Sequence, residues 1–181
     1  MTDRIEIIEK KLEEIMDLLE IERTESNKDT PYRIAKMWVN EIFINRNDNN
    51  LDLLKSKMKV FENVDSINDL IIIKDIDFHT YCEHHWLPFF GKVAVGYVPD
   101  KYIIGLSKVP RVVEYFSKRP QLQERFVKDI AVFLNEVIKP KCIFVVAEAV
   151  HTCVLCRGIE AGSNTNTVYK IINDKNLSDL S

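Results

Sequence analysis

Two short segments rich in metal-binding side chains constrain the fold of this chain more than any other feature. "TYCEHHWLPFFG" carries one cysteine and two histidines, and "EAVHTCVLCRG" carries one histidine and two cysteines. The six side chains are Cys82, His84, His85, His151, Cys153 and Cys156. Because the two segments lie about 70 residues apart, only a fold that brings them together can build a complete metal site.

One interpretation is a closed, structural zinc site. Its four ligands would be Cys82, His85, Cys153 and Cys156, and the C-x-x-C spacing of the last two fits a zinc knuckle. Against it, the segment continues a predicted strand, in which Cys153 and Cys156 would point to opposite faces. That geometry favours only one of the two cysteines as a ligand.

A second interpretation is an open, catalytic site. Three protein ligands then hold the metal, and the fourth position holds a water that the metal acidifies toward neutral pH. His84 and His151 would exchange protons beside the metal, because the pKa of histidine lies near neutrality. A buried cluster of thiols and imidazoles without a metal is the third interpretation.

Composition excludes several classes of protein. The chain has 181 residues and a net charge of 25 minus 28, or −3, which is unlike the basic footprint of a nucleic-acid-binding protein. It has no apolar run near the roughly 20 residues of a membrane helix, and its charged N-terminus is unlike a signal peptide. We therefore expect a cytoplasmic protein without nucleic-acid or membrane partners, whose reduced cysteines are free to bind metal.

Hydrophobic periodicity predicts two N-terminal helices. The first covers residues 3–22, with an apolar face. In the second, Thr30 is the expected N-cap and Pro31 the first helical residue. The polar segment 45–50 is the expected loop, and residues 51–69 give no clear pattern.

The rest of the chain alternates between strand and helix patterns. Strands are predicted at residues 70–78, 92–98, 102–106, 142–151 and 165–172. Helices are predicted at residues 108–118, capped by Ser107 and with Pro110 in the first turn, and at 121–138. This order predicts an α+β fold with an antiparallel sheet and helices on one face. We expect one structural unit overall, made of an N-terminal helical segment, 1–50, and a catalytic α+β domain, 51–181.

A candidate anion site precedes the first of these later helices. Ser107, Lys108 and Arg111 lie where free N–H groups and the helix dipole favour a negative charge. Lys108 and Arg111 are one turn apart and could grip one phosphate, although a solvated helix cap has the same pattern. Arg157 adds a third cation beside the second cysteine segment. The chain has no GxxxxGK[ST] loop, which argues against phosphoryl transfer on that scaffold.

The start of the long helix carries another candidate pair. Gln123 and Glu124 follow "RPQL", and an inward-facing carboxylate there could accept two hydrogen bonds from a guanine edge. Such residues also commonly cap and solvate a helix, so the pair is ambiguous by itself.

Taken together, five ordered motifs resemble the GTP cyclohydrolase I family. They are "DTPYRIAKMW", "CEHHWLPFFG", "IGLSKVPR", "QLQER" and "EAVHTCVLCRG". The resemblance covers most of the chain. It implies conversion of GTP and water to formate and 7,8-dihydroneopterin triphosphate, a product that feeds folate, biopterin or deazaguanine synthesis. It also implies the tunnelling fold, in which pentamers stack into decamers as oligomeric barrels with active sites between subunits.

The resemblance also assigns roles to single residues. Cys82, His85 and Cys153 match the family's zinc ligands, which implies Zn²⁺ as cofactor and an open water position. The matches to the catalytic set are His84, His151 and Ser107. The matches to the triphosphate-binding and guanine-binding residues are Lys108, Arg111, Arg157, Gln123 and Glu124, with Glu124 anchoring the base.

The chain departs from the family pattern at three places. Cys156 replaces a methionine of C-M-x-M-R-G, which keeps the closed zinc site open as an alternative. Pro110 and Pro120 stand near positions that are usually alanine and leucine, and could shift the helix start that carries the phosphate contacts. Two further alternatives are an enzyme that opens the guanine ring without completing the pterin, and a non-catalytic, zinc-stabilised nucleotide-binding protein.

Overall fold

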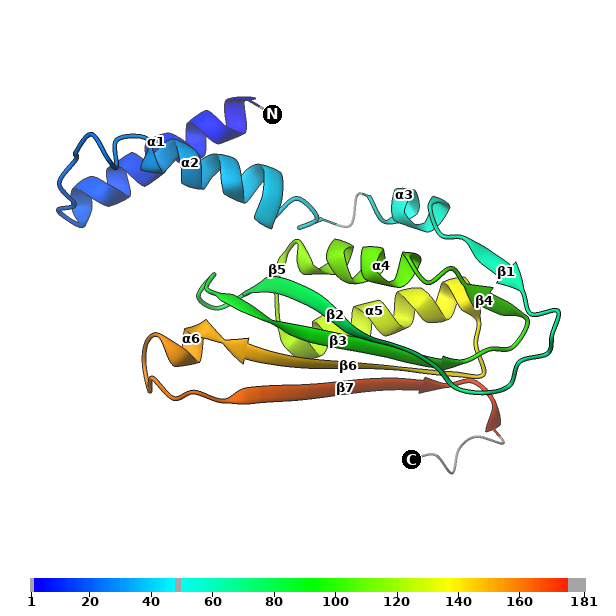
Figure 1. Ribbon diagram of the computed structural model, residues 1–181. Helices are drawn as coiled ribbons and strands as arrows, with labels where there is room; N and C mark the ends of the chain where they lie inside the picture. Colours follow the sequence, from blue (N-terminus) through cyan, green and yellow to red (C-terminus); the bar gives the residue numbers. More distant parts are fainter. Residues whose placement is uncertain (1, 48–49, 176–181) are drawn as a thin grey trace.

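The body of the protein is a five-stranded sheet with two helices on one face (Figure 1). The computed structural model describes residues 2–47 and 50–175. The strands lie in the order β5-β2-β3-β6-β7. Their bounds are β2 Ile71–Cys82, β3 Pro88–Val98, β5 Pro120–Gln121, β6 Cys142–His151 and β7 Asn164–Ile172. The predicted α+β class is therefore confirmed.

The sheet is antiparallel except at one edge. β2, β3, β6 and β7 pair antiparallel with their neighbours, whereas β5 pairs parallel with the end of β2 through two residues. The prediction of a wholly antiparallel sheet is wrong at this edge. The reason is the direction of the chain. The helix α4, Lys108–Ser117, and β5 run in the same direction as β2, so β5 lies parallel to the end of β2 (Figure 1).

Two amphipathic helices bury the core against this sheet. They are α4, Lys108–Ser117, and α5, Gln123–Ile138. Phe126, Ile130 and Leu134 of α5 are fully buried against the sheet residues Val93 and Val95. Each such side chain contributes about 1.5–3 kcal/mol by leaving water. This packing fixes both ends of α5 relative to the strand ends.

The N-terminal helices form an arm that projects from the body (Figure 1). They are α1, Thr2–Leu18, α2, Thr30–Met37, and the π-helix η1, Trp38–Ile42. The first helix ends before residue 22 because Glu20 is left-handed, with φ +55°. The N–H of Ile21 then donates to Met16 O at 3.0 Å, a Schellman ending. Thr30 is the first helical residue, so the N-cap is Asp29 and not Thr30.

Several boundaries differ from the predicted ones. β2 continues to Cys82 and β3 begins at Pro88, so the strands of this hairpin are longer than the pattern indicates. The region without a prediction forms α3, Leu51–Ser56, and β1, Val60–Glu62. β1 pairs with β4, Tyr102–Ile104, in a second small sheet. Residues 48–49 of the predicted loop and residues 176–181 lie outside the described residues. The predicted division of the chain into residues 1–50 and 51–181 stays a prediction.

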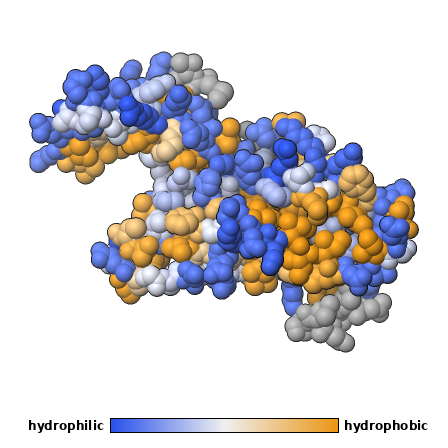
Figure 2. All heavy atoms as spheres, in the orientation of Figure 1, coloured by the Kyte–Doolittle hydropathy of each residue, from blue (hydrophilic) through white to orange (hydrophobic). Residues whose placement is uncertain are grey.

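The sheet face away from α4 and α5 exposes apolar side chains at one end. Leu70, Ile72 and Val168 keep about half or more of their surface accessible, at 48%, 52% and 61%. A shallow cavity of about 470 Å³ at this end is lined by neighbours such as Val98 and Phe144. Figure 2 shows apolar side chains gathered at this end, at the right of the view. Among the described residues, no helix is both long and apolar enough to cross a membrane.

Strand β6 leaves no room for a side chain on Gly91 of β3. A Cβ atom on Gly91 would lie 1.9 Å from the backbone oxygen of Glu148. Real Cβ atoms do not come this near, and a strand backbone cannot move aside as a flexible side chain can. Only glycine therefore fits at this point of the β3–β6 ladder.

We predict that Gly91→Ala lowers the free energy of unfolding by about 3 kcal/mol, the upper end of the range for overpacked substitutions. The large effect is expected because the added Cβ would clash with a backbone atom, the oxygen of Glu148. Urea denaturation measures the change. Gly162→Ala is the matched control, since its Cβ would meet nothing nearer than Leu155 Cδ1 at 3.7 Å. Equal midpoints for the two variants would contradict the close approach.

Candidate metal centre and active site

Strand pairing brings the two metal-binding segments together. β3 lies between β2 and β6 and is antiparallel to both, so the ends of β2 and β6 flank the start of β3. Tyr81 is opposite Pro88, and Phe89 is opposite His151. Cys82 ends β2, and Cys153 lies two residues beyond the end of β6. The fold therefore places the first and second segments at one end of the sheet (Figure 1).

Three of the six candidate ligands form one cluster. The donor atoms of Cys82, His85 and Cys153 all lie within 4.8 Å of one another. Cys82 Sγ and His85 Nδ1 are 4.0 Å apart. Tetrahedral zinc bonds of about 2.0–2.3 Å would separate such donors by about 3.5–3.8 Å. The donor set therefore fits a zinc ion with only small side-chain shifts.

The thiols of this cluster interact directly. Burial raises the pKa of the Cys153 thiol, and a hydrogen bond with Cys82 raises it further. The positive charge of Arg157 opposes this shift. A metal that binds here must therefore displace a proton from Cys153, because the thiolate is the ligand form.

Cys156 lies outside the cluster. The strand ends at His151, and the next four residues form the short helix α6, Thr152–Leu155. The predicted strand alternation of Cys153 and Cys156 is therefore wrong, because both lie in a helical turn. Cys153 is buried, whereas Cys156 is exposed at the helix end. In the described part of the chain, the donor cluster contains three residues and not four.

His151 is held in a defined orientation and tautomer. Its ring stacks on Phe89 with a centroid distance of 4.5 Å and an interplanar angle of 9°. Its Nε2 lies 2.7 Å from Oε1 of Gln123, whose Nε2 donates to the carbonyls of Ala147 and Thr165, both at 2.9 Å. Because that oxygen only accepts, Nε2 of His151 carries the ring proton and Nδ1 keeps its lone pair. Burial lowers the pKa of His151, and the nearby carboxylate of Glu124 partly opposes this.

The other predicted residues at this end differ in their contacts. His84 is exposed, and its Nδ1 lies 3.7 Å from Cys82 Sγ. Arg157 donates to Nε2 of His85 at 3.0 Å. Glu124 is exposed in the first turn of α5. Gln123 is 2% exposed, and its amide is occupied by the bonds to β6, β7 and His151.

Three of the predicted phosphate residues, Ser107, Lys108 and Arg111, lie at the other end of the sheet from the metal-binding segments. α4 begins at Lys108, just after β4, and the N–H of Ile104 in β4 bonds Tyr97 Oη at 3.3 Å. Tyr97 is near the far end of β3, on the order of 30 Å from its start at about 3.3 Å per residue. One chain therefore does not bring Ser107, Lys108 and Arg111 to the metal cluster.

An ion pair that sequence reasoning missed fixes the turn between β2 and β3. Nη1 of Arg125 lies 2.5 Å from Oε2 of Glu83, which stands between Cys82 and His84. The signal was present as opposite charges in two of the motifs. A sequence alone cannot pair them, because they are 42 positions apart.

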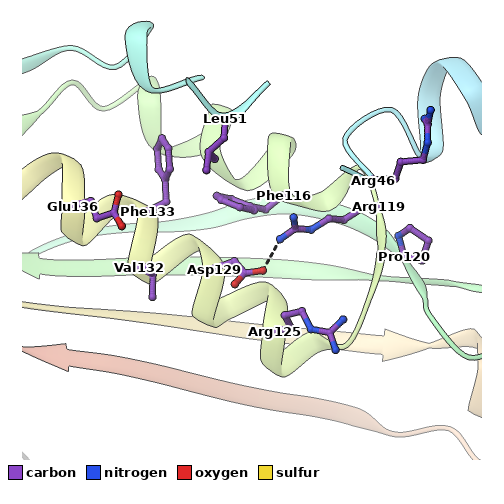
Figure 3. Close-up of a pocket in the computed structure, with 10 residues that line it drawn as sticks. All are labelled: Arg46, Leu51, Phe116, Arg119, Pro120, Arg125, Asp129, Val132, Phe133 and Glu136. Atoms are coloured by element: carbon purple, nitrogen blue, oxygen red, sulfur yellow. Dashed lines mark hydrogen bonds and ion pairs between the residues drawn. The ribbon is translucent and has the colours of Figure 1, made fainter. Parts of the chain in front are cut away.

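A groove of about 360 Å³ lies along the outer side of α5, beyond this ion pair (Figure 3). Within it Arg119 points to Asp129 and forms an ion pair, and Arg125 lies at one end. Phe116 and Phe133 supply apolar walls. None of the candidate ligands lines this groove, so it is separate from the metal cluster.

We predict that Gln123→Leu lowers the free energy of unfolding by about 1–3 kcal/mol, because the carbonyl of buried Ala147, the carbonyl of Thr165 and the ring of His151 lose their partner. Urea denaturation of the metal-free protein measures the loss. Lys128→Leu, at an exposed position of α5, controls for the change in helix preference. If both variants unfold at the wild-type midpoint, the hydrogen bonds of Gln123 do not hold this site.

Comparison with known proteins places the chain in a family. The sequence model described as GTP cyclohydrolase I matches residues 8–177. The "GTP cyclohydrolase 1" of Sulfurihydrogenibium sp. (strain YO3AOP1) is 44% identical over 147 residues, which cover 81% of this chain and 74% of that protein. The "GTP cyclohydrolase 1" of Aquifex aeolicus (strain VF5) is 47% identical over 135 residues, which cover 75% of this chain and 68% of that protein.

A crystal structure of the archaeosine synthase QueF-Like in the apo form shares 16% identity and a TM-score of 0.45, covering 56% of this chain and 91% of that one. A resemblance this weak adds nothing to the assignment. The family match spans most of the chain, and the relatives are similar over most of their own length. This chain therefore belongs to the GTP cyclohydrolase I family.

Proposed function

We propose that this chain is a GTP cyclohydrolase I that opens the guanine imidazole ring of GTP at a zinc centre, releases formate and closes the pterin ring of 7,8-dihydroneopterin triphosphate. Family membership and relatives of that name support the activity. The cluster of Cys82, His85 and Cys153 is the observation that carries the metal centre. Thiolate and imidazole donors suit zinc, and three ligands leave a position for water.

A zinc ion held by these residues supplies Lewis acidity that activates water for hydrolysis. The protein's own contribution begins with His151. Its Nδ1 is the free proton acceptor, because Gln123 keeps the proton on Nε2. The stacked ring of Phe89 limits rotation of the imidazole. We assign proton transfer at the opening purine ring to His151 and to the exposed His84.

Arg157 would lose its contact with His85 if zinc occupied the cluster. A neutral imidazole has one lone pair, and the contact with Arg157 uses that of Nε2 in His85. If His85 binds zinc through Nδ1, which faces Cys82, its Nε2 must carry the proton and cannot accept from Arg157. The guanidinium of Arg157 would then be available to a phosphate of GTP.

The substrate site requires a second copy of the chain. Ser107, Lys108 and Arg111 lie at the opposite end of the sheet from the metal cluster, so a neighbouring copy must supply them if they bind the triphosphate. The exposed apolar end of the sheet, around Ile72 and Val168, supports an interface between copies. We therefore propose an oligomeric barrel, a decamer of two pentamers, in which Glu124 anchors the guanine base and Gln123 acts through His151.

The remaining assignments rest on the sequence. The cytoplasmic location, the absence of nucleic-acid and membrane partners, and the division at residue 50 stay predictions. Because Cys156 lies outside the donor cluster, no observation favours the closed zinc site or the non-catalytic alternative over the enzyme.

We predict that Cys153→Ser abolishes zinc binding and GTP turnover together, because it removes one of three ligands. Cys156→Ala is the matched control, three residues away in the same helical turn, and should keep both. Atomic absorption of the purified proteins measures zinc, and formate release measures turnover. Loss of zinc in Cys156→Ala, or zinc with full activity in Cys153→Ser, would contradict the ligand assignment.

We further predict that two inactive variants complement each other. Cys153→Ser damages the metal half of the site, and Arg111→Ala damages the phosphate half. In oligomers assembled from equal amounts of both, about a quarter of the sites combine two intact halves from different copies. Co-expression with two affinity tags isolates the mixed oligomers. Mixed oligomers without formate release would contradict a site shared between copies.

A further inference from the structure

The turn that carries His84 and His85 contains a tryptophan in a strained conformation. Trp86 has φ +53°, in the left-handed region that non-glycine residues seldom adopt. Its N–H donates to Cys82 O at 2.9 Å, which closes the turn onto the end of β2. Residues in such conformations persist only where their surroundings hold them. The question is what holds Trp86.

The N-terminal arm holds the indole of Trp86. Its ring meets Trp38 edge to face at 5.3 Å and Phe43 at 5.4 Å between centroids. Phe43 also packs on Tyr81 of β2 at 5.9 Å. We call these four side chains the aromatic clamp. Two of them come from the arm end, and two from the metal-binding hairpin.

The π-helix brings both arm rings to one side. The N–H of Phe43 donates to Trp38 O at 3.0 Å, five residues back, which closes a turn wider than that of an α-helix. The chain after the clamp is tied to the body by Asn45, whose backbone N–H donates to Lys118 O at 3.1 Å and whose side chain donates to Tyr115 O at 3.0 Å. The end of the arm is therefore fixed to the body through Asn45 as well as through Trp86.

The opposite side of the turn is fixed by the body itself, through the ion pair of Arg125 with Glu83. Glu83 and Trp86 stand at the two ends of the segment that contains His84 and His85. Removing either attachment leaves the segment free to relax from its strained form. His85 is the ligand most affected, because Trp86 follows it directly.

We propose that Trp86 is a positioning residue for the metal centre, through which the N-terminal arm holds the ligand His85 in place. This inference rests on the proposed zinc site and adds a dependence of that site on the arm. Trp86 is 51% exposed, so its removal should not empty the core. The effect on the metal is therefore separable from an effect on folding.

The test compares variants by their zinc affinity and by the visible absorption spectrum of the Co²⁺-substituted protein, which reports ligand geometry. Trp86→Ala and Trp38→Ala should each weaken zinc binding about tenfold or more, the range for groups that orient metal ligands. Both should alter the Co²⁺ spectrum. Trp86→Phe keeps a ring in the clamp and should restore both readouts.

Tyr32→Ala is the matched control, because Tyr32 lies on the same arm with a ring contact to Lys36 outside the clamp. It should bind zinc as the wild type does. Trp38 lies outside the turn, so Trp38→Ala keeps the test valid if Trp86→Ala fails to fold. Circular dichroism and urea denaturation of the metal-free proteins monitor folding.

The outcomes separate this inference from the function on which it rests. Wild-type zinc affinity and an unchanged Co²⁺ spectrum in both alanine variants would overturn the role of Trp86 and leave the metal centre intact. A wild-type protein that binds no zinc would overturn the metal centre itself. Equal weakening in Tyr32→Ala would show a general effect of the arm and would also overturn the role of the clamp.

Discussion

The structure depends most on the pairing of β3 with a strand on each side. Because β3 is antiparallel to both β2 and β6, the ends of those strands meet at its start. Thr152 Oγ1 donates to Pro88 O at 2.6 Å, and the N–H of Cys82 donates to Leu87 O at 2.9 Å, which fix both segments there. A slip of one residue would turn Cys82 to the other face of the sheet and dismantle the donor cluster. The donor cluster of Cys82, His85 and Cys153 is thus a consequence of strand register.

Three parts of the structure hold the side chains of the site in place: α5, the N-terminal arm and the sheet. α5 contributes Gln123, which ties His151 to the sheet, and Arg125, which holds the turn before His84. The arm holds the same turn through Trp86. The sheet then separates this metal end from the start of α4. For the proposed function, a single chain accordingly contains the donor cluster with its supports and Arg157, and a neighbouring copy would supply Ser107, Lys108 and Arg111.

Much of this arrangement could be predicted from the sequence. Apolar periodicity located α1, α4 and α5, because helices that bury one face must repeat every three to four residues. Spacing could not choose among the donors, because that depended on the conformation of the residues that follow β6. The four-residue α6 turns Cys153 inward and leaves Cys156 exposed, and no local pattern announces it. The left-handed Trp86 and the ion pair of Glu83 with Arg125 were also beyond prediction, since both are fixed by distant partners.

The products formed from GTP test most directly whether the cluster of Cys82, His85 and Cys153 is a catalytic centre. Purified protein would be incubated with GTP, with and without a chelator and with zinc restored afterwards, and the products identified by mass spectrometry. We expect formate and 7,8-dihydroneopterin triphosphate, lost with the chelator and regained with zinc. GTP left intact by protein that demonstrably holds zinc at Cys82, His85 and Cys153 would contradict the central claim that this cluster is a catalytic centre.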